Sequence, residues 1–405
     1  MTAFAQFRNT IHLPKGFSFS AATAGIKASG RLDLALVEAV PGTTAAALFT
    51  RNLVVAAPVE VGRVNLAKGK GRVRAIIVNS GNANCATGKA GLKACRQVCQ
   101  EVAGELGIRP EEVFPSSTGI IGVPLPAEKI VAKLPELIGN REPTPVMFDR
   151  FTQAIMTTDT HQKWASSQFR AGFSEVSLLG VAKGSGMIHP QLATMLVYLL
   201  TDVAATPGEL KRLLSDACDQ SFNCISVDGD TSTNDTVLLM ASGQSGIRLR
   251  DAAVREKFAT ALSTVCQSLA EQIVSDGEGV QHVIRLSIEQ AGTRQEALQV
   301  ARTIAHSLLV KTAWAGADPN WGRILAAVGR SGVVLDPKRI DIYIANQMVC
   351  KGGAGCKFDE ARAHQDLAQP SSEVRVRLGR GRIRVEFITS DLTAEYVQIN
   401  ADYST

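Results

Sequence analysis

The sequence lacks the spacings that mark metal sites and disulfide frameworks. Its six histidines are scattered, and no H-E-x-x-H or similar ligand spacing occurs, so we expect no bound metal. Its eight cysteines include no C-x-x-C pair. In a chain of 405 residues, cysteines without such a pairing pattern are expected to be reduced and buried.

Long apolar runs are also missing. The most apolar stretch, residues 192–200, has about half the length that a membrane-spanning helix needs. Residues 1–20 contain no continuous apolar core of the kind that a secretory leader has. These patterns predict a cytoplasmic protein that does not associate with membranes.

Neither sign of charge is in large excess. The 43 Lys and Arg exceed the 38 Asp and Glu by only five, which is too little in this length to indicate nucleic-acid binding. Residues 373–386 are rich in arginine, but Glu373 and Glu386 are also part of them and no aromatic residue is interleaved. We interpret them as a solvated strand face, with nucleic-acid binding as the weaker alternative.

Two common catalytic loops are absent. The segment from Gly81 to Ala90 has six residues between its outer glycines and lacks Ser or Thr after Lys89, so it is not a Walker-type phosphate loop. No G-x-S-x-G elbow occurs, which disfavours an α/β-hydrolase.

The sequence does contain strand and helix patterns in alternation. Residues 74–79 and 236–241 are continuous apolar runs that predict buried strands. Residues 92–106 carry a helical apolar stripe that Gly107 is placed to end, and residues 254–273 predict a long amphipathic helix. Long helices that follow strands predict a mixed α/β fold with sheets covered by helices.

Capping boxes and a turn signal mark other boundaries. Thr206 with Glu209, and Thr293 with Glu296, predict two helix starts, the second helix running to about Val310. Residues 374–378 and 383–387 alternate in polarity around a Gly-Arg-Gly turn, which predicts a hairpin.

Seven segments are too polar and too rich in glycine to belong to a hydrophobic core. Small hydroxyl and amide residues beside buried strands commonly line sites, although the same residues also form ordinary turns. The segments are 79–88, 116–122, 157–160, 183–194, 228–236, 276–279 and 317–323.

Taken in order, these segments resemble those of the ornithine acetyltransferases, the bifunctional glutamate N-acetyltransferases of arginine biosynthesis. The resemblance spans essentially the whole chain. It is most specific at residues 183–190 (KGSGMIHP) and 192–196 (LATML), and the other segments support it in order.

This resemblance implies a fold and a processing event. The fold is a layered α/β sandwich similar to that of N-terminal-nucleophile hydrolases, with a smaller C-terminal α/β subdomain at approximately 290–388. The precursor cleaves itself between Ala193 and Thr194. The products, an α chain of 1–193 and a β chain of 194–405, stay associated as a heterotetramer of two α and two β chains.

The resemblance also implies the chemistry and the site. Thr194 is the nucleophile that carries acetyl from N-acetylornithine to glutamate, and Thr118 (hydroxyl) and Gly119 (backbone N–H) stabilise the oxyanion. No cofactor stays bound, and acetyl-CoA is a candidate co-substrate. The matching substrate-binding positions are Thr157, Lys183, Thr194, Glu278, Asn400 and Thr405.

Several alternatives stay open at this point. The enzyme either exchanges acetyl between amino acids only or also uses acetyl-CoA. A self-cleaving aminopeptidase would share the mechanism, and a non-catalytic binding protein would remain uncut. On residue type alone, Lys183 and Glu278 would be surface charges, Asn400 and Thr405 a loose tail, and Thr194 a core threonine.

Overall fold

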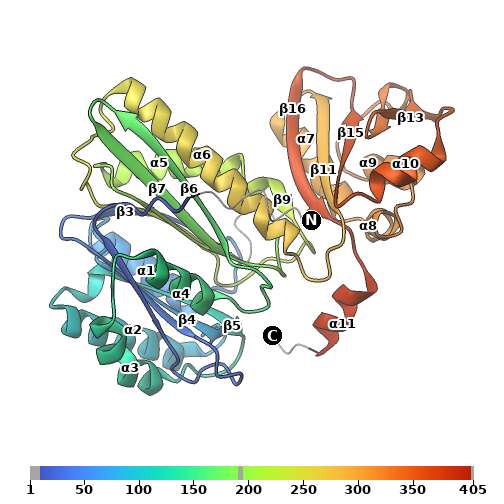
Figure 1. Cartoon of the computed structure of the whole chain (residues 1–405). Helices are drawn as coiled ribbons and strands as arrows, with labels where there is room; N and C mark the ends of the chain where they lie inside the picture. The colour runs from blue at the N-terminus through green and yellow to red at the C-terminus, as the bar shows by residue number, and fades with distance from the viewer. Residues whose placement is uncertain (1–9, 190–194, 403–405) are drawn as a thin grey trace.

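The computed structural model describes residues 10–189 and 195–402. Two stacked sheets between helices form its larger body, and a third sheet forms a smaller C-terminal unit (Figure 1). The mixed α/β fold class expected from the sequence is confirmed: the sheets and helices are layered, and a smaller α/β subdomain follows at the C-terminal end.

The first sheet of the larger body has four strands. Antiparallel pairing joins its first three strands, whereas β4 and β5 are parallel, so their carboxyl ends meet at one edge. In spatial order the strands are β1 (Phe17–Ala22), β2 (Leu34–Ala39), β4 (Ala75–Asn82) and β5 (Val113–Ile120).

The second sheet has five strands and packs face to face on the first. Its central strand β8 begins at Leu196, just after the predicted cleavage position. In spatial order the strands are β3 (Thr44–Phe49), β10 (Thr236–Ala241), β8 (Leu196–Thr201), β7 (Ser174–Lys183) and β6 (Lys163–Ala171).

Helices cover the outer faces of both sheets. The first sheet carries α1 (Ala57–Lys68), α2 (Gly88–Leu106) and α3 (Ala127–Gly139). The second sheet carries α5 (Pro207–Asp219) and α6 (Ala252–Ser275). A sixth helix, α4 (Pro145–Ile155), places Phe148 and Phe151 in the apolar layer between the sheets. Three apolar layers therefore hold the larger body together.

The C-terminal unit is built on a seven-stranded sheet. Its last strand, β9, comes from the larger body and pairs with β16, which ties the two units together. The spatial order is β14 (Ala354–Gly355), β13 (Gln347–Lys351), β12 (Asp341–Ile344), β15 (Ser371–Arg377), β11 (Val283–Ala291), β16 (Ile383–Ser390) and β9 (Ile225–Ser226).

Helices also pack on this sheet, and the last one leaves it. They are α7 (Arg294–Ala305), α8 (Leu308–Ala315), α9 (Trp321–Gly329) and α10 (Glu360–Leu367). The final helix, α11 (Ala394–Asp402), extends from the unit back toward the larger body and buries none of its own residues (Figure 1).

Several local predictions are confirmed. α2 ends as expected at Gly107, whose φ of 63° is the left-handed conformation that glycine adopts readily. The capping box of Thr206 and Glu209 opens α5. All eight cysteine thiols are free, and seven of them are buried.

Two local predictions are wrong. β15 and β16 do not form a hairpin, because β11 lies between them and pairs parallel with one and antiparallel with the other. The helix that begins after Thr293 stops at Ala305, and α8 starts separately at Leu308. In addition, the Glu296 carboxylate accepts the N–H of Gly292, so the second capping box is incomplete.

Candidate active site

One pocket collects most of the predicted site residues. It contains about 620 Å³ of empty space, part of it open solvent, and lies where the end of β5, the end of β7 and α11 converge. Ala193, Thr194 and Thr405 lie outside the described residues. The six other predicted residues all line the pocket: Thr118, Gly119, Thr157, Lys183, Glu278 and Asn400.

Thr118 and Gly119 occupy the carboxyl end of β5, where the strand runs parallel to β4. Gly119 has a φ of 130° and pairs with Gly81 of β4. A Cβ at Gly119 would lie 2.4 Å from the carbonyl carbon of Gly81, so only glycine fits this approach. Thr118 beside it is 7% exposed. The Ser-Thr-Gly segment is therefore held rigidly at the pocket wall.

Buried amide side chains hold this strand end in place. Asn234 Nδ2 donates to the carbonyl oxygens of Ala83 (2.7 Å) and Ser117 (2.9 Å), which links the 228–236 segment to both strand ends. Ser117 Oγ donates to Asn79 Oδ1 at 2.6 Å, and Asn79 Nδ2 donates to the carbonyl of Asn82 at 2.8 Å. Most of the asparagine-rich loop thus has a structural role, because its amides satisfy buried backbone groups.

The TTDT segment is bonded to the segment that precedes the predicted cleavage position. Thr158 Oγ1 and Ser185 Oγ are 2.7 Å apart. The Asp159 carboxylate accepts the backbone N–H of Gly184 (2.6 Å) and of Thr157 (3.0 Å). Two segments that lie far apart in the sequence therefore form one wall of the pocket.

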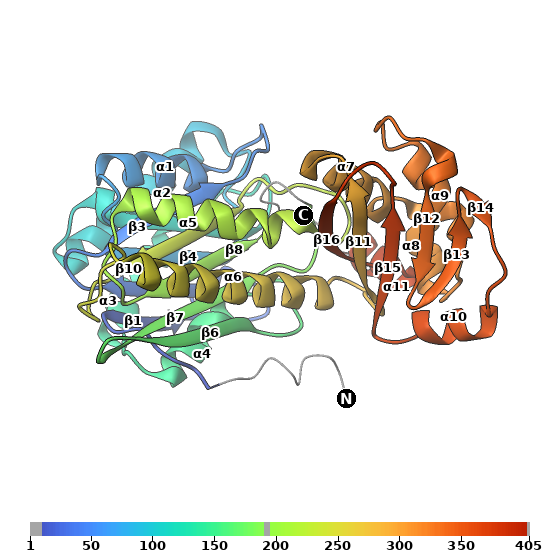
Figure 2. The ribbon, with the colours of Figure 1, turned by 90° about the horizontal axis from the view of Figure 1, so that it is seen from above.

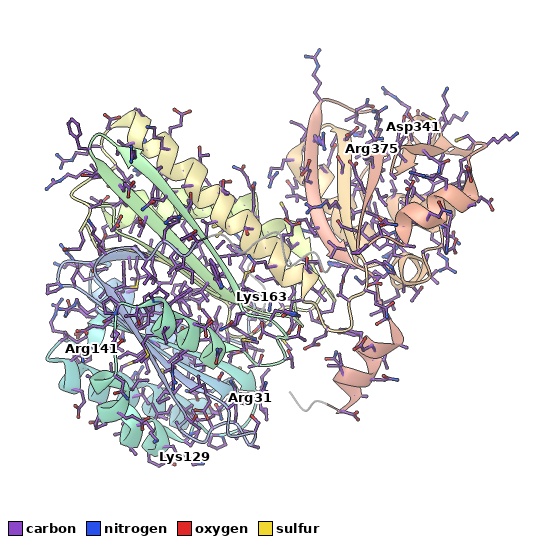
Figure 3. The ribbon with its side chains drawn as sticks, viewed as in Figure 1. Arg31, Lys129, Arg141, Lys163, Asp341 and Arg375 are labelled. Atoms are coloured by element: carbon purple, nitrogen blue, oxygen red, sulfur yellow. The ribbon has the colours of Figure 1, made fainter. Side chains whose placement is uncertain are left out.

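A buried ion cluster lies behind this wall. Lys163 Nζ is 2.7 Å from Asp159 Oδ1 and also binds Asp276, and Lys183 Nζ is 3.8 Å from Asp159 Oδ2. The four side chains are at most 5% exposed. Lys163, labelled in Figure 3, begins β6 and meets Asp276 at the carboxyl end of α6. Lys183 is the member of the cluster that reaches the pocket.

The cluster keeps Asp159 and Lys163 charged despite their burial. Burial alone would raise the pKa of Asp159, but the ammonium groups of Lys163 and Lys183 reverse this and lower its pKa below the ordinary value. Burial would likewise lower the pKa of Lys163, whereas Asp159 and Asp276 raise it. The pocket therefore receives a lysine whose position is fixed by buried charges.

Sequence reasoning missed Lys163 and Asp276 as members of the site. Asp276 belongs to the DGEG segment, in which only Glu278 is predicted to bind substrate. Lys163 alternates with Ala165 on the inward-facing side of β6. A lysine at an inward-facing position of a strand could have predicted this ion pair, because a buried charge requires a buried partner of opposite charge.

Glu278 and Asn400 meet in the same pocket. Asn400 Nδ2 donates to Glu278 Oε2 at 2.9 Å, and the backbone N–H of Glu278 donates to the carbonyl of Ser185 at 3.1 Å. A Cβ at Gly186 would lie 2.4 Å from Glu278 Oε2, so glycine gives the carboxylate its space. Helix α11 thus brings Asn400 from the chain end to the pocket.

The described residues on both sides of 190–194 are anchored by aspartates of the 228–236 segment. Asp228 accepts the backbone N–H of Ile188 at 2.9 Å and that of Met187. Asp235 Oδ1 accepts the N–H of Met195 at 2.9 Å. Burial raises the pKa of Asp228 to about 6 and that of Asp235 well above its ordinary value. Neither aspartate was assigned an individual role from the sequence.

Two further findings concern the described part of the chain. Within residues 10–189 and 195–402, no group of three or more His, Cys, Asp or Glu side chains is arranged to hold a metal ion. None of the helices in these ranges is long and apolar enough to cross a bilayer.

Comparison with known proteins shows which family and which relatives this chain resembles. Residues 18–405 match the model of the ArgJ family. The arginine biosynthesis bifunctional protein ArgJ of Methylococcus capsulatus is 45% identical over 96% of this chain and 95% of its own length. That of Pseudomonas fluorescens is 40% identical over 98% of each chain. The crystal structure of the corresponding Bacillus halodurans protein is 40% identical, with a TM-score of 0.49, over 51% of this chain and 98% of that chain.

Proposed function

This chain belongs to the ArgJ family, and we propose that it transfers acetyl from N2-acetylornithine to glutamate through an acetyl-Thr194 intermediate. The observation that carries the proposal is the convergence of Thr118, Lys183 and Glu278 on one pocket from three distant segments. Two of these groups are charged, as recognition of amino acids requires. The substrates are small and polar, and we place the reaction in the cytoplasm.

The nucleophile is created by cleavage of the precursor. In the intact chain the nitrogen of Thr194 is an amide and cannot accept a proton. The Thr194 hydroxyl attacks the Ala193 carbonyl, the acyl group shifts from nitrogen to oxygen, and water then hydrolyses the ester. The freed α-amine titrates near pH 8 (about 7.7–8.0 for an unperturbed amine) and serves as the base for the neighbouring hydroxyl. Residues 1–193 and 194–405 then form the two chains, which we propose assemble as an α2β2 heterotetramer.

Thr118 and Gly119 stabilise the negative oxygen that forms at the acetyl carbonyl. A preorganised donor of this kind is worth about 3–4 kcal/mol in the transition state. The close pairing of Gly119 with Gly81 supports this role, because it fixes the backbone N–H before substrate binds. The hydroxyl of Thr118 lies on the same pocket wall.

Lys183 and Glu278 supply opposite charges to the two ends of an amino acid. We assign the substrate carboxylate to the Lys183 ammonium and a substrate ammonium to Glu278. Asn400 orients Glu278 through the 2.9 Å bond between their side chains. Thr157 contributes to the pocket wall, and Thr405 is assigned to substrate binding by family resemblance.

Acetyl-CoA is proposed as a second acetyl donor, because the relatives are named bifunctional proteins of arginine biosynthesis. An assay with acetyl-CoA and glutamate, in the absence of N-acetylornithine, tests this activity. Acetylglutamate formed at a rate comparable to the exchange reaction supports two donors, and its absence restricts the enzyme to exchange.

Trapping of the intermediate tests the main proposal. The enzyme is incubated with N-acetylornithine without glutamate, quenched in acid, digested and analysed by mass spectrometry. We expect one added acetyl group on the peptide that begins at Thr194, and its loss when glutamate is supplied. Acetyl found on another residue, or on none while exchange proceeds, would refute the acetyl-threonine route.

A further inference from the structure

A second pocket, outside the site described above, is lined by three arginines. It contains about 810 Å³ of empty space, part of it open solvent. Arg51 follows β3, whereas Arg294 and Arg302 lie on α7, and the carboxyl end of α5 closes the pocket at Asp219. Figure 2 shows α5 directed toward α7. We call this the arginine pocket.

Three guanidinium groups and one carboxylate, that of Asp219, line the pocket, so its positive charge is only partly balanced among the described residues. None of the three guanidinium groups forms an ion pair there, and Asp219 Oδ1 is occupied by Asn223 Nδ2 at 2.7 Å. Arg294 donates to the Asp219 carbonyl and to the Cys224 sulfur, both of which are uncharged. The arginine pocket therefore concentrates three positive charges around a cavity that contains one acidic side chain.

Arg302 is the most constrained of the three. Its Nε is buried and has no hydrogen-bond partner in the described part of the chain. Burial lowers the pKa of Arg302, and the neighbouring guanidinium groups of Arg294 and Arg51 lower it further. Like charges held together at a half-buried site repel each other unless an anion binds between them.

The segments that carry Ser232 of the active-site pocket and Arg51 of the arginine pocket are hydrogen-bonded to each other. Ser232 lines the active-site pocket, and its carbonyl accepts the hydroxyl proton of Thr50 at 2.8 Å. Arg51 is the next residue, and Asn52 Nδ2 donates to the Thr231 carbonyl at 3.0 Å. The segment through residues 231–235 therefore borders the active site and is bonded to the segment that carries Arg51.

We propose that the arginine pocket binds the phosphate groups of acetyl-CoA while its thioester reaches the active-site pocket. This inference rests on the proposed use of acetyl-CoA as a second donor. Guanidinium groups bind phosphate oxygens through paired N–H donors. N-acetylornithine has no phosphate, so the arginine pocket serves one donor only.

The chemical step balances without any further reactant. The Thr194 oxygen forms a bond to the acetyl carbon, and the carbon–sulfur bond of the thioester breaks. The proton of the hydroxyl passes through the α-amine to the thiolate, and CoA leaves as its thiol. The resulting acetyl-threonine is the same intermediate that N-acetylornithine forms, so both donors supply one acceptor reaction.

The test combines residue changes with truncation of the donor. Arg51→Gln/Arg302→Gln is compared with wild type using acetyl-CoA, acetyl-pantetheine and N-acetylornithine. We expect the KM for acetyl-CoA to rise at least tenfold, with both other donors unaffected. Arg212→Gln is the matched control, because Arg212 is exposed on α5 and does not line the arginine pocket. An unchanged KM for acetyl-CoA, or an equal loss with acetyl-pantetheine, overturns the inference.

Direct binding separates this inference from the proposed activity. Calorimetry with CoA, which carries no acetyl group, is done on wild type and on the double variant. Tenfold weaker binding to the double variant supports the arginine pocket even if acetyl-CoA proves not to be a donor. Equal binding to both proteins overturns it. Inorganic pyrophosphate that binds wild type as tightly as CoA also overturns the assignment, since the site would then take any phosphate.

Discussion

Replacement of Asp159 by asparagine tests the buried ion cluster behind the active site. Asp159 Oδ1 accepts from Lys163 Nζ at 2.7 Å and from the N–H of Gly184 at 2.6 Å. Its Oδ2 accepts from the N–H of Thr157 at 3.0 Å and lies 3.8 Å from Lys183 Nζ. Asparagine has the same shape, but its amide nitrogen would face the donors on one side and its negative charge is gone.

The structure sets the size of the expected effect. Removal of one partner from a buried ion pair costs about 3–5 kcal/mol, because the remaining charge stays out of water. Lys163 keeps Asp276 as a partner, so we expect the lower end of that range, about 3 kcal/mol. A loss of this size changes the unfolding equilibrium about a hundredfold.

Urea unfolding followed by tryptophan fluorescence measures this loss, and Trp164 lies beside Lys163 on β6. Asp216→Asn is the matched control, since Asp216 is exposed on α5 and its replacement should change stability by less than about 0.5 kcal/mol. If Asp159→Asn destabilises by no more than this control, the ion cluster does not stabilise the fold as described.

The lowered pKa of Asp159 predicts how the stability of the fold depends on pH. The pKa of Asp159 is lower in the folded protein than its ordinary value of about 3.9, so the folded state binds its proton less readily than the unfolded state. Its contribution is complete above about pH 5 and is lost as the pH falls through the folded pKa. We expect wild type to lose stability below about pH 4 more steeply than Asp159→Asn does. Parallel curves for the two proteins would contradict this.

Three further predictions concern the pocket and the approach to position 194. Thr118→Ala should lower kcat for acetyl exchange about 100- to 1000-fold and slow self-cleavage, as one oxyanion donor is lost; unchanged rates would remove Thr118 from this role. Gly119→Ala should lower kcat by at least as much, because its Cβ would lie 2.4 Å from Gly81 and the strands must separate; full activity would mean that the backbone N–H is not used. Asp235→Ala should slow the appearance of two chains on a denaturing gel, since it leaves the N–H of Met195 unpaired. Asp235→Asn keeps a neutral acceptor and should be cleaved near the wild-type rate. Equal cleavage rates for both variants would show that the hydrogen bond from Met195 to Asp235 does not assist cleavage.

Local boundaries were predictable because the signals that set them lie within a few residues. Gly107 ends α2, and Thr206 with Glu209 opens α5, through contacts within one helical turn. The hairpin prediction was wrong because the pairing of these strands depends on a strand that is distant in the sequence. The alternation in residues 374–378 and 383–387 specifies two half-buried strands but not their neighbour. β11, from far earlier in the chain, occupies the place between them.

The candidate site was likewise predictable only in part. Motif order led to Thr118, Lys183, Glu278 and Asn400, and these four side chains line one pocket. The ion cluster around Asp159 could not be derived in this way, because Lys163 meets Asp276 across 113 residues. Pairing of that kind depends on tertiary packing, and the sequence signal was limited to charged residues in inward-facing positions.

The most direct test of the account is the intact mass of purified, active protein together with the amino-terminal sequence of each fragment. We predict two chains, one ending at Ala193 and the other beginning at Thr194, and a single chain near 43.1 kDa for an inactive Thr194→Ala variant. Active enzyme that consists of one uncut chain, or a second fragment that begins at another residue, would contradict the proposed chemistry.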